Sequence, residues 1–366
     1  MKNDKKRIES LARPELTRFR GYLACKSPET IARKLGMPTE KIVKLDANEN
    51  NYGSSPRVTR ALESYDAYHI YPDAAQTELR DLLSQYTGMP CSQIVAGAGS
   101  DQLIDLIIKL FAAPGEEIIN MVPTFAMYRF YADLNGAKIV DVPRETDFQI
   151  DVAAVKKAVT AKTRLIFLAN PNNPTGNLTM KKDIQALLET GLPLVVDEAY
   201  YEFTGESAIP LMSDWPNLMV LRTFSKWSGL AGLRVGYGVF PIEISNYMHG
   251  IRDPYNVNVA AQVAVRESFR DMDYLMGNVK KIIAERDRLA DELGNIRWLK
   301  AYPSKSNFIL CEVLEGNARE LQQKLENMGI LVRHYTEPRL INCLRFSVGR
   351  PEEDDILIGA LKQFGR

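Results

Sequence analysis

The chain has few of the residues from which disulfide frameworks and metal sites are built. Its 366 residues include 4 cysteines and 3 histidines. The cysteines are scattered and form no paired motif; they are Cys25, Cys91, Cys311 and Cys343. This usage predicts reduced thiols in a cytoplasmic protein. The histidines stand apart from one another and from the cysteines, so we expect structural or surface roles for them and no metal site.

The chain also lacks an excess of charge of either sign and any long apolar run. The chain has 46 lysine and arginine residues and 46 aspartate and glutamate residues, so it has no overall positive charge to attract nucleic acid. No run approaches the ~18 apolar residues of a membrane span, and no apolar signal core follows the charged start MKNDKKRIES. We therefore expect neither nucleic acid nor a membrane as a partner.

Strand-like and helix-like segments alternate from about residue 92 onward. The apolar runs EEIINMVP, AKIVDVP, TRLIFLANP, LPLVVDEAY and NLMVLRTFS predict strands, whereas SDQLIDLIIKLF, FAMYRFYADL and KKDIQALLE predict helices. This alternation is typical of an α/β fold with a mostly parallel sheet that helices cover on both faces.

The length of the chain predicts two lobes. The segment from about residue 256 to 293 has a long helical pattern and links the first lobe to a smaller α+β lobe. We expect an N-terminal segment over residues 1–45 that packs on the small domain. A large domain is expected over residues 46–270 and a small C-terminal domain over residues 271–366.

Polar residues follow several predicted strands at the point where each strand ends. They occupy positions 99–101, 170–176, 197–200 and 223–226. Ligands of parallel α/β sheets bind beyond the carboxyl ends of the strands. These four segments are therefore expected to form one site.

The run Thr223-Phe224-Ser225-Lys226, followed by Arg234 in GLAGLRVGYG, carries the most specific chemistry. A lysine amine can form an imine with an aldehyde, and hydroxyls and a guanidinium can bind a phosphate. Most lysines are simply surface partners in ion pairs. Here the preceding strand and the glycine-rich run favour a covalently held phosphate cofactor, and pyridoxal phosphate has these needs.

Other segments supply the remaining needs of pyridoxal phosphate. Asp197 is a partner for the ring nitrogen, and Tyr200 and Asn173 are partners for the phenolic oxygen. Taken singly, Asp197 is equally a turn cap and Asn173 part of an ordinary Asn-Pro turn. The segment 99–101 suits a phosphate at a helix N-terminus but is also ordinary capping sequence. Phe125 is equally a ring-stacking or a core aromatic.

Together these segments resemble the fold-type I pyridoxal-phosphate aminotransferases, and among them the histidinol-phosphate aminotransferases. The resemblance runs from LDANEN at 45–50 to CLRFSVG at 343–349 and includes GAGSDQ, PTFAMY, PNNPTG, DEAY, TFSK and GLAGLRVGYG. It implies a mostly parallel seven-stranded sheet between helices, with a smaller α+β domain. It also implies a homodimer in which Tyr71 reaches the cofactor phosphate of the partner subunit.

The resemblance implies a role in cofactor binding or catalysis for a set of residues. Lys226 would be the catalytic, imine-forming amine. The cofactor-binding set would be Tyr71, Gly99, Ser100, Asp101, Phe125, Asn173, Asp197, Tyr200, Thr223, Ser225, Lys226 and Arg234. The substrate-binding set would be Tyr22, Asn48, Arg333 and Arg345, with Arg345 on the α-carboxylate.

The implied reaction passes nitrogen from an amino donor through pyridoxal phosphate to a 2-oxo acid, with histidinol phosphate and 2-oxoglutarate as one pair. An aromatic amino acid transaminase and a decarboxylase of a phosphorylated hydroxy amino acid remain open, because both share the cofactor motifs. Trp227, beside the lysine, departs from the small residue of many relatives and bears on substrate choice. A dinucleotide-binding dehydrogenase is disfavoured, since GAGSDQ is not G-x-G-x-x-G.

Overall fold

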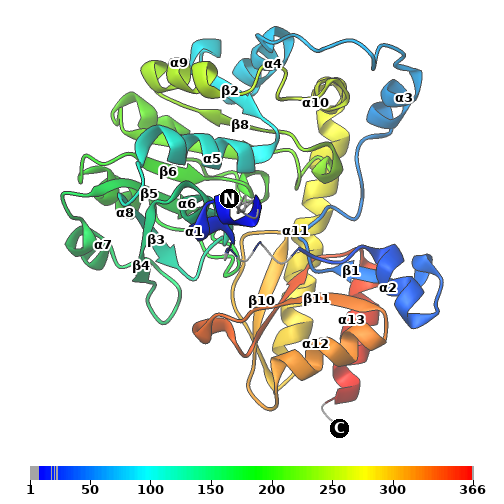
Figure 1. Cartoon of the computed structure of the whole chain (residues 1–366). Helices are drawn as coiled ribbons and strands as arrows, with labels where there is room; N and C mark the ends of the chain where they lie inside the picture. Colours follow the sequence, from blue (N-terminus) through cyan, green and yellow to red (C-terminus); the bar gives the residue numbers. More distant parts are fainter. Residues whose placement is uncertain (1–7, 18, 20, 22–23, 365–366) are drawn as a thin grey trace, which may run out of the picture.

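The computed structural model describes residues 8–17, 19, 21 and 24–364. The chain forms one sheet of seven strands and one of five, with helices packed around both (Figure 1). The helical region predicted between them consists of α10 (Val259–Arg270) and α11 (Met272–Gly294), which meet at Asp271. The long helix α11 extends from the large lobe to the small one (Figure 1).

The seven-stranded sheet confirms the predicted fold class. Its strands lie in the order β2-β8-β7-β6-β5-β3-β4, and all neighbours are parallel except β8, which is antiparallel to β2 and β7. The strands are β2 (Ile94–Gly97), β3 (Glu117–Val122), β4 (Lys138–Pro143), β5 (Thr163–Ala169), β6 (Leu194–Asp197), β7 (Leu218–Thr223) and β8 (Gly236–Val239).

Helices cover both faces of this sheet, and successive residues of its central strands pack into two different hydrophobic cores. Val195 belongs to a core with α5, α6 and α9, whereas Val196 belongs to the opposite core with α4, α7, α8 and α10. Burial on both faces explains the uninterrupted apolar runs of these strands. The helices of this lobe are α3 (Pro56–Ser64), α4 (Thr77–Thr87), α5 (Gly99–Phe111), α6 (Met127–Asn135), α7 (Val152–Ala158), α8 (Lys181–Leu188) and α9 (Ile242–Ile251).

The five-stranded sheet forms the small lobe, with strands in the order β1-β11-β12-β10-β9. The first strand of the chain, β1, pairs in parallel with β11, so residues before the large sheet belong to this smaller one. The domain limits at residues 45 and 270 stay predictions. The elements of this lobe are α2 (Pro28–Leu35), β1 (Val43–Leu45), β9 (Leu299–Ala301), β10 (Phe308–Val313), α12 (Ala318–Asn327), β11 (Ile330–His334), β12 (Cys343–Ser347) and α13 (Pro351–Phe364).

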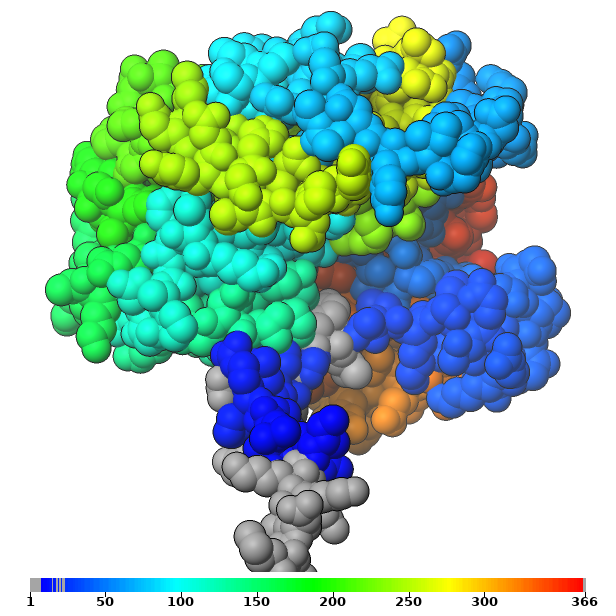
Figure 2. All heavy atoms as spheres, turned by 45° about the horizontal axis from the view of Figure 1, so that its top comes forward, coloured from blue at the N-terminus to red at the C-terminus, as the bar shows by residue number. Residues whose placement is uncertain are grey.

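The N-terminal segment contacts both lobes. After the short helix α1 (Pro14–Thr17), the Phe19 ring packs edge-on against Phe130 of α6, with 5.2 Å between ring centroids. Further on, Lys26 and Lys34 form ion pairs with Glu326 of α12. Figure 2 shows the darkest blue residues of this segment beside the blue-green surface of the large lobe. Within the described ranges, no helix is long and apolar enough to cross a membrane.

Candidate active site

The carboxyl ends of β5, β6 and β7 lie side by side because these strands pair in parallel. Residues that follow them line one hollow of about 480 Å³, together with the start of α5 and the loop after β1. The predicted site residues that line this hollow are Asn48, Ser100, Asp101, Phe125, Asn173, Asp197, Tyr200, Thr223, Ser225, Lys226, Arg234 and Arg345. The structure thus brings four distant sequence segments to one place.

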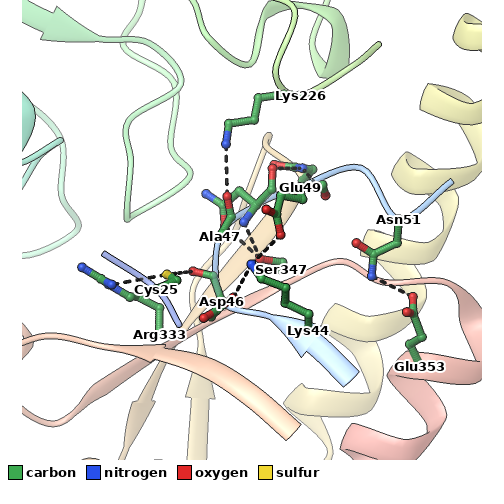
Figure 3. Close-up of polar contacts among 12 residues, drawn as sticks. Cys25, Lys44, Asp46, Ala47, Glu49, Asn51, Lys226, Arg333, Ser347 and Glu353 are labelled. Atoms are coloured by element: carbon green, nitrogen blue, oxygen red, sulfur yellow. Dashed lines mark hydrogen bonds and ion pairs between the residues drawn. The ribbon is translucent and has the colours of Figure 1, made fainter. Parts of the chain in front are cut away.

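Lys226 follows β7 and points toward the loop after β1 (Figure 3). Its Nζ donates a hydrogen bond to the backbone oxygen of Ala47 at 3.1 Å. Burial, and then the charge of Arg345, lower the pKa of Lys226 to about 8. A lysine with this pKa has a much larger unprotonated fraction near neutral pH than an ordinary lysine, so it can act as a nucleophile or base.

Asp197 ends β6 and is buried. Its Oδ2 accepts a hydrogen bond from Tyr128 Oη at 2.8 Å, and its Oδ1 accepts one from the backbone N–H of Ala199 at 3.1 Å. Burial raises the pKa of Asp197 to about 6, and these two donors oppose part of that rise. A protonated ring nitrogen in the hollow would give this carboxylate a partner of opposite charge.

Tyr128 was missed by the sequence reasoning. It lies in α6, is fully buried and stacks on Phe167 with 4.6 Å between ring centroids. Burial, and then the neighbouring Asp197 charge, raise the pKa of Tyr128 well above its usual range, so it stays a hydrogen-bond donor. The only local signal is its spacing of three from Phe125, which precedes α6 and packs edge-on against the Tyr128 ring with 5.6 Å between ring centroids. That spacing is equally typical of a core-facing pair.

The raised pKa of Asp197 has a consequence for stability without cofactor. Because the folded-state pKa lies above the ordinary value, ionisation destabilises the fold as the pH rises from about 4 through about 6. We expect Asp197→Asn, which keeps the size and removes the charge, to raise the free energy of unfolding of the cofactor-free protein by roughly 3 kcal/mol at pH 8. Urea unfolding measures this difference. It should nearly vanish at pH 4, and an equal difference at both pH values would contradict the ionisation account.

The start of α5 and Arg234 form one end of the hollow. Gly99 has φ +79°, and a Cβ there would lie 2.8 Å from Arg234 Nη2, so only glycine allows this approach. Likewise a Cβ on Gly236 would lie 2.5 Å from the backbone N of Ser100. Arg234 Nη2 forms an ion pair with Asp101 Oδ2 at 2.8 Å. Backbone amides at a helix N-terminus beside a guanidinium suit a phosphate group.

Two buried hydroxyls complete this end of the hollow. Thr223 Oγ1 and Ser225 Oγ are hydrogen-bonded at 3.0 Å, and the backbone N–H of Ser225 donates to Thr223 Oγ1 at 3.1 Å. Both residues are more than nine-tenths buried. The donors at this end are therefore hydroxyls, amides and one guanidinium, which is the set a phosphomonoester accepts from.

Arg345 lines the hollow from β12 of the small lobe. Its Nη1 donates to Asn173 Oδ1 at 2.6 Å and its Nη2 to the backbone oxygen of Asp46 at 2.7 Å. Its guanidinium carbon lies 5.2 Å from the centroid of the Phe308 ring. The planar fork is thus held beside the residue predicted to touch the cofactor ring, where it could bind a carboxylate in a bidentate manner.

Arg333 does not line the 480 Å³ hollow but an adjoining one of about 750 Å³, which also includes Cys25, Phe125, Asn173 and Arg345. Its Nη1 donates to Cys25 Sγ at 3.4 Å (Figure 3). Arg333 and Arg345 are register partners on the antiparallel strands β11 and β12. The prediction for Tyr22 concerns a residue outside the described ranges.

Two residues singled out by sequence lie away from the hollow. Tyr71 is 78% exposed and stacks on Tyr255, with 4.6 Å between ring centroids. Trp227 is fully buried among Tyr86, Phe224 and Phe269, so its bulk fills the core and does not enter the hollow. In the part of the chain that the structure describes, no group of three or more His, Cys, Asp or Glu side chains is arranged to hold a metal ion.

Comparison with known proteins agrees with this geometry. Residues 40–361 match the model of the aminotransferase class I and II family. The chain therefore belongs to the class I and II aminotransferases.

Within that family the chain is similar along nearly its whole length to proteins named histidinol-phosphate aminotransferase. The one from Dehalococcoides mccartyi is 54% identical over 98% of this chain and 99% of its own length. The one from Roseiflexus castenholzii is 47% identical over 97% of this chain and 98% of its own length. The Sinorhizobium meliloti protein, whose crystal structure is in complex with pyridoxal-5'-phosphate, is 28% identical in sequence. The structural match covers 98% of both chains, with a TM-score of 0.87.

Proposed function

We propose that the chain is a pyridoxal-phosphate-dependent transaminase that passes the amino group of L-histidinol phosphate to 2-oxoglutarate. The products would be imidazole acetol phosphate and L-glutamate, in histidine biosynthesis. The observation that carries the proposal is the single hollow shared by the Lys226 amine, the Asp197 carboxylate and the Arg345 guanidinium. When bound, pyridoxal phosphate supplies an electron sink for the bonds at the substrate carbon that bears nitrogen.

The residues present fit this cofactor by their chemistry. Asp197 is a desolvated carboxylate that gains an opposite charge from a protonated ring nitrogen. Asn173 and Tyr200 would donate to the phenolic oxygen, and Phe125 would stack on the ring. The phosphate would lie among Ser100, Thr223, Ser225, Arg234 and the Asp101 amide, which line the hollow, and the amide of Gly99 at the start of α5.

Lys226 would hold the aldehyde carbon and then act as the proton carrier. With cofactor and substrate bound, the free Lys226 Nζ would take a proton from the substrate carbon that bears nitrogen and deliver it on the cofactor side. Its pKa, lowered to about 8, suits this task near neutral pH. Arg345 would bind the α-carboxylate of the oxo acid.

Two observations support the proposed substrates. Relatives that are 54% and 47% identical over nearly the whole chain bear the name histidinol-phosphate aminotransferase. In addition, Arg333 and Arg345 lie on paired strands and border two adjoining hollows. Guanidinium groups bind both phosphate and carboxylate, so such a pair suits a pocket that must accept a phosphomonoester and then a dicarboxylate.

The proposal includes a homodimer in the cytoplasm. Tyr71 lies outside its own hollow and is 78% exposed, as expected if it reaches the cofactor phosphate of a partner subunit. Ile70, next to Tyr71 in the chain, and Tyr255, which stacks on it, are also exposed, and contiguous exposed apolar side chains are typical of an interface. The four free cysteines support a reducing compartment.

A half-reaction screen tests the function. The cofactor-loaded protein is mixed separately with histidinol phosphate, phenylalanine, tyrosine and threonine phosphate, and loss of the yellow absorbance band is followed. We expect histidinol phosphate to convert the cofactor to its amine form most efficiently. Conversion by phenylalanine and not by histidinol phosphate would identify an aromatic amino acid transaminase, and release of CO₂ from threonine phosphate a decarboxylase. A protein that stays colourless after cofactor addition would end the proposal.

A further inference from the structure

The loop over residues 46–50 joins the hollow to both sheets. The backbone oxygens of Asp46 and Ala47 accept hydrogen bonds from Arg345 and Lys226, at 2.7 and 3.1 Å. Figure 3 shows this loop between the Lys226 side chain and the small-lobe strands. Asn48, at the centre of the loop, is 1% exposed and is its most buried residue.

Every polar group of Asn48 is bonded within the protein. Its backbone N–H donates to Ser347 Oγ at 2.8 Å, and its Oδ1 accepts from the same Oγ at 3.1 Å. Its backbone oxygen accepts from Asn307 Nδ2 at 3.0 Å. Its Nδ2 donates to Tyr200 Oη at 2.9 Å. A direct bond from this amide to substrate would have to compete with these protein contacts.

The backbone also restricts what can occupy position 48. Asn48 has φ +53°, in the left-handed region that asparagine and glycine tolerate better than other residues. Asparagine therefore satisfies two demands there, a left-handed backbone and an amide placed between Ser347 and Tyr200. Only the placement of the amide concerns the chemistry of the hollow. A glycine at position 48 would keep the left-handed backbone and remove the amide, so it tests the two demands separately.

We infer that Asn48 is a positioning residue that ties the Tyr200 hydroxyl to strand β12, and is not a substrate ligand. The inference rests on the proposed function, in which Tyr200 donates to the phenolic oxygen of the cofactor. A hydroxyl that accepts a hydrogen bond becomes a stronger donor through its own hydrogen, so the Asn48 amide strengthens the bond that Tyr200 makes.

The hydrogen bonds of Asn48 also link Tyr200 to the strand that carries Arg345. Ser347 and Arg345 lie two residues apart on β12, so their side chains leave the same face of the strand. One strand therefore presents the guanidinium for the substrate carboxylate and, through Ser347 and Asn48, orients the hydroxyl for the cofactor ring. Phe308 of the neighbouring strand β10 packs edge-on against Tyr200, with 5.2 Å between ring centroids, and supports the same placement.

The test is the pH titration of the absorbance band of the bound cofactor in Asn48→Gly. Glycine keeps the left-handed backbone free of strain, adds no charge and removes the amide. A weaker donor from Tyr200 stabilises negative charge on the phenolic oxygen less, so the proton affinity of the bound cofactor rises. We expect the midpoint to shift upward by roughly 0.5–1 pH unit.

Two comparisons make the test specific. Asn50→Ala is the matched control. Asn50 belongs to the same loop but lies outside the hollow, and its Nδ2 donates to the Trp227 backbone oxygen at 2.9 Å. It should leave the midpoint unchanged. Tyr200→Phe should raise the midpoint at least as much as Asn48→Gly, and the double variant should shift no further than Tyr200→Phe alone, because residues that act through one contact are not additive.

The outcomes separate this inference from the proposed function. A wild-type protein that binds no pyridoxal phosphate would overturn the function, and the role of Asn48 with it. A wild-type protein that binds it while Asn48→Gly titrates like Asn50→Ala would overturn only the role of Asn48. The role of Asn48 would also be overturned if Asn48→Gly shifted the pH midpoint as much in the Tyr200→Phe background as in the parent. It would be overturned as well if Asn48→Gly left the midpoint unchanged and only raised the donor concentration needed for half-conversion.

Discussion

Lys226→Ala is expected to lower the rate of amino transfer by roughly 10⁴-fold, the upper range for removal of a positioned proton carrier. The substitution removes the amine that bonds the cofactor and the base that moves the proton. No other lysine lines the 480 Å³ hollow, so no described side chain can replace it. Single-turnover conversion of the loaded protein by histidinol phosphate measures the loss.

A matched control for this variant is Lys44→Ala. Lys44 lies near the same loop, pairs with Asp46 and Glu49 and stays outside the hollow (Figure 3). It should keep the covalent cofactor bond. Partial rescue of Lys226→Ala by added methylamine would show that the missing group is an amine. A rate within tenfold of the parent would remove Lys226 from the chemistry.

Arg345→Ala is expected to weaken binding of 2-oxoglutarate by roughly 2–5 kcal/mol, the usual cost of removing one member of a buried charge pair. Arg345 is 6% exposed, and Asn173 and the Asp46 backbone fix its guanidinium, so its removal leaves the carboxylate of the oxo acid without a prepared partner. The concentration of oxo acid that half-saturates re-formation of the yellow cofactor should rise by roughly 30-fold or more.

The conservative variant Arg345→Lys sharpens this prediction. Lysine keeps the charge but lacks the planar fork, so it should recover part of the affinity and not all of it. Equal affinity in Arg345→Ala and the parent would show that the carboxylate binds elsewhere. The adjoining Arg333 would then be the next candidate, because it borders the neighbouring hollow.

The strand-tip residues could be predicted because parallel strands place their carboxyl ends at one edge of a sheet. Asp197 and Thr223 end the neighbouring strands β6 and β7, and Lys226 follows three residues later. Their proximity thus follows from the apolar runs that predict the strands and from the parallel pairing of those strands. Arg333 and Arg345 needed the family resemblance, since nothing in the CLRFSVG run states which strand lies beside it.

The loop at 46–50 could not be placed by such reasoning. Its contacts join residues far apart in the chain, such as Asn48 with Ser347 and Ala47 with Lys226. They exist because β1 pairs with β11 in the small lobe, whereas alternation predicts only sequential neighbours in the large one. For the same reason the resemblance implies a substrate role for Asn48, whereas its four contacts within the protein depend on the fold. Tyr128 was missed because a tyrosine in an amphipathic helical run is typical of a core.

The central claim is that the Lys226 amine carries the cofactor. The most direct measurement treats the cofactor-loaded protein with borohydride, digests it and locates the pyridoxyl mass on its peptides. The label is expected on Lys226 and on no other lysine, and it should be absent from Lys226→Ala. A label on a different lysine, or a loaded protein that takes up none, would contradict the claim.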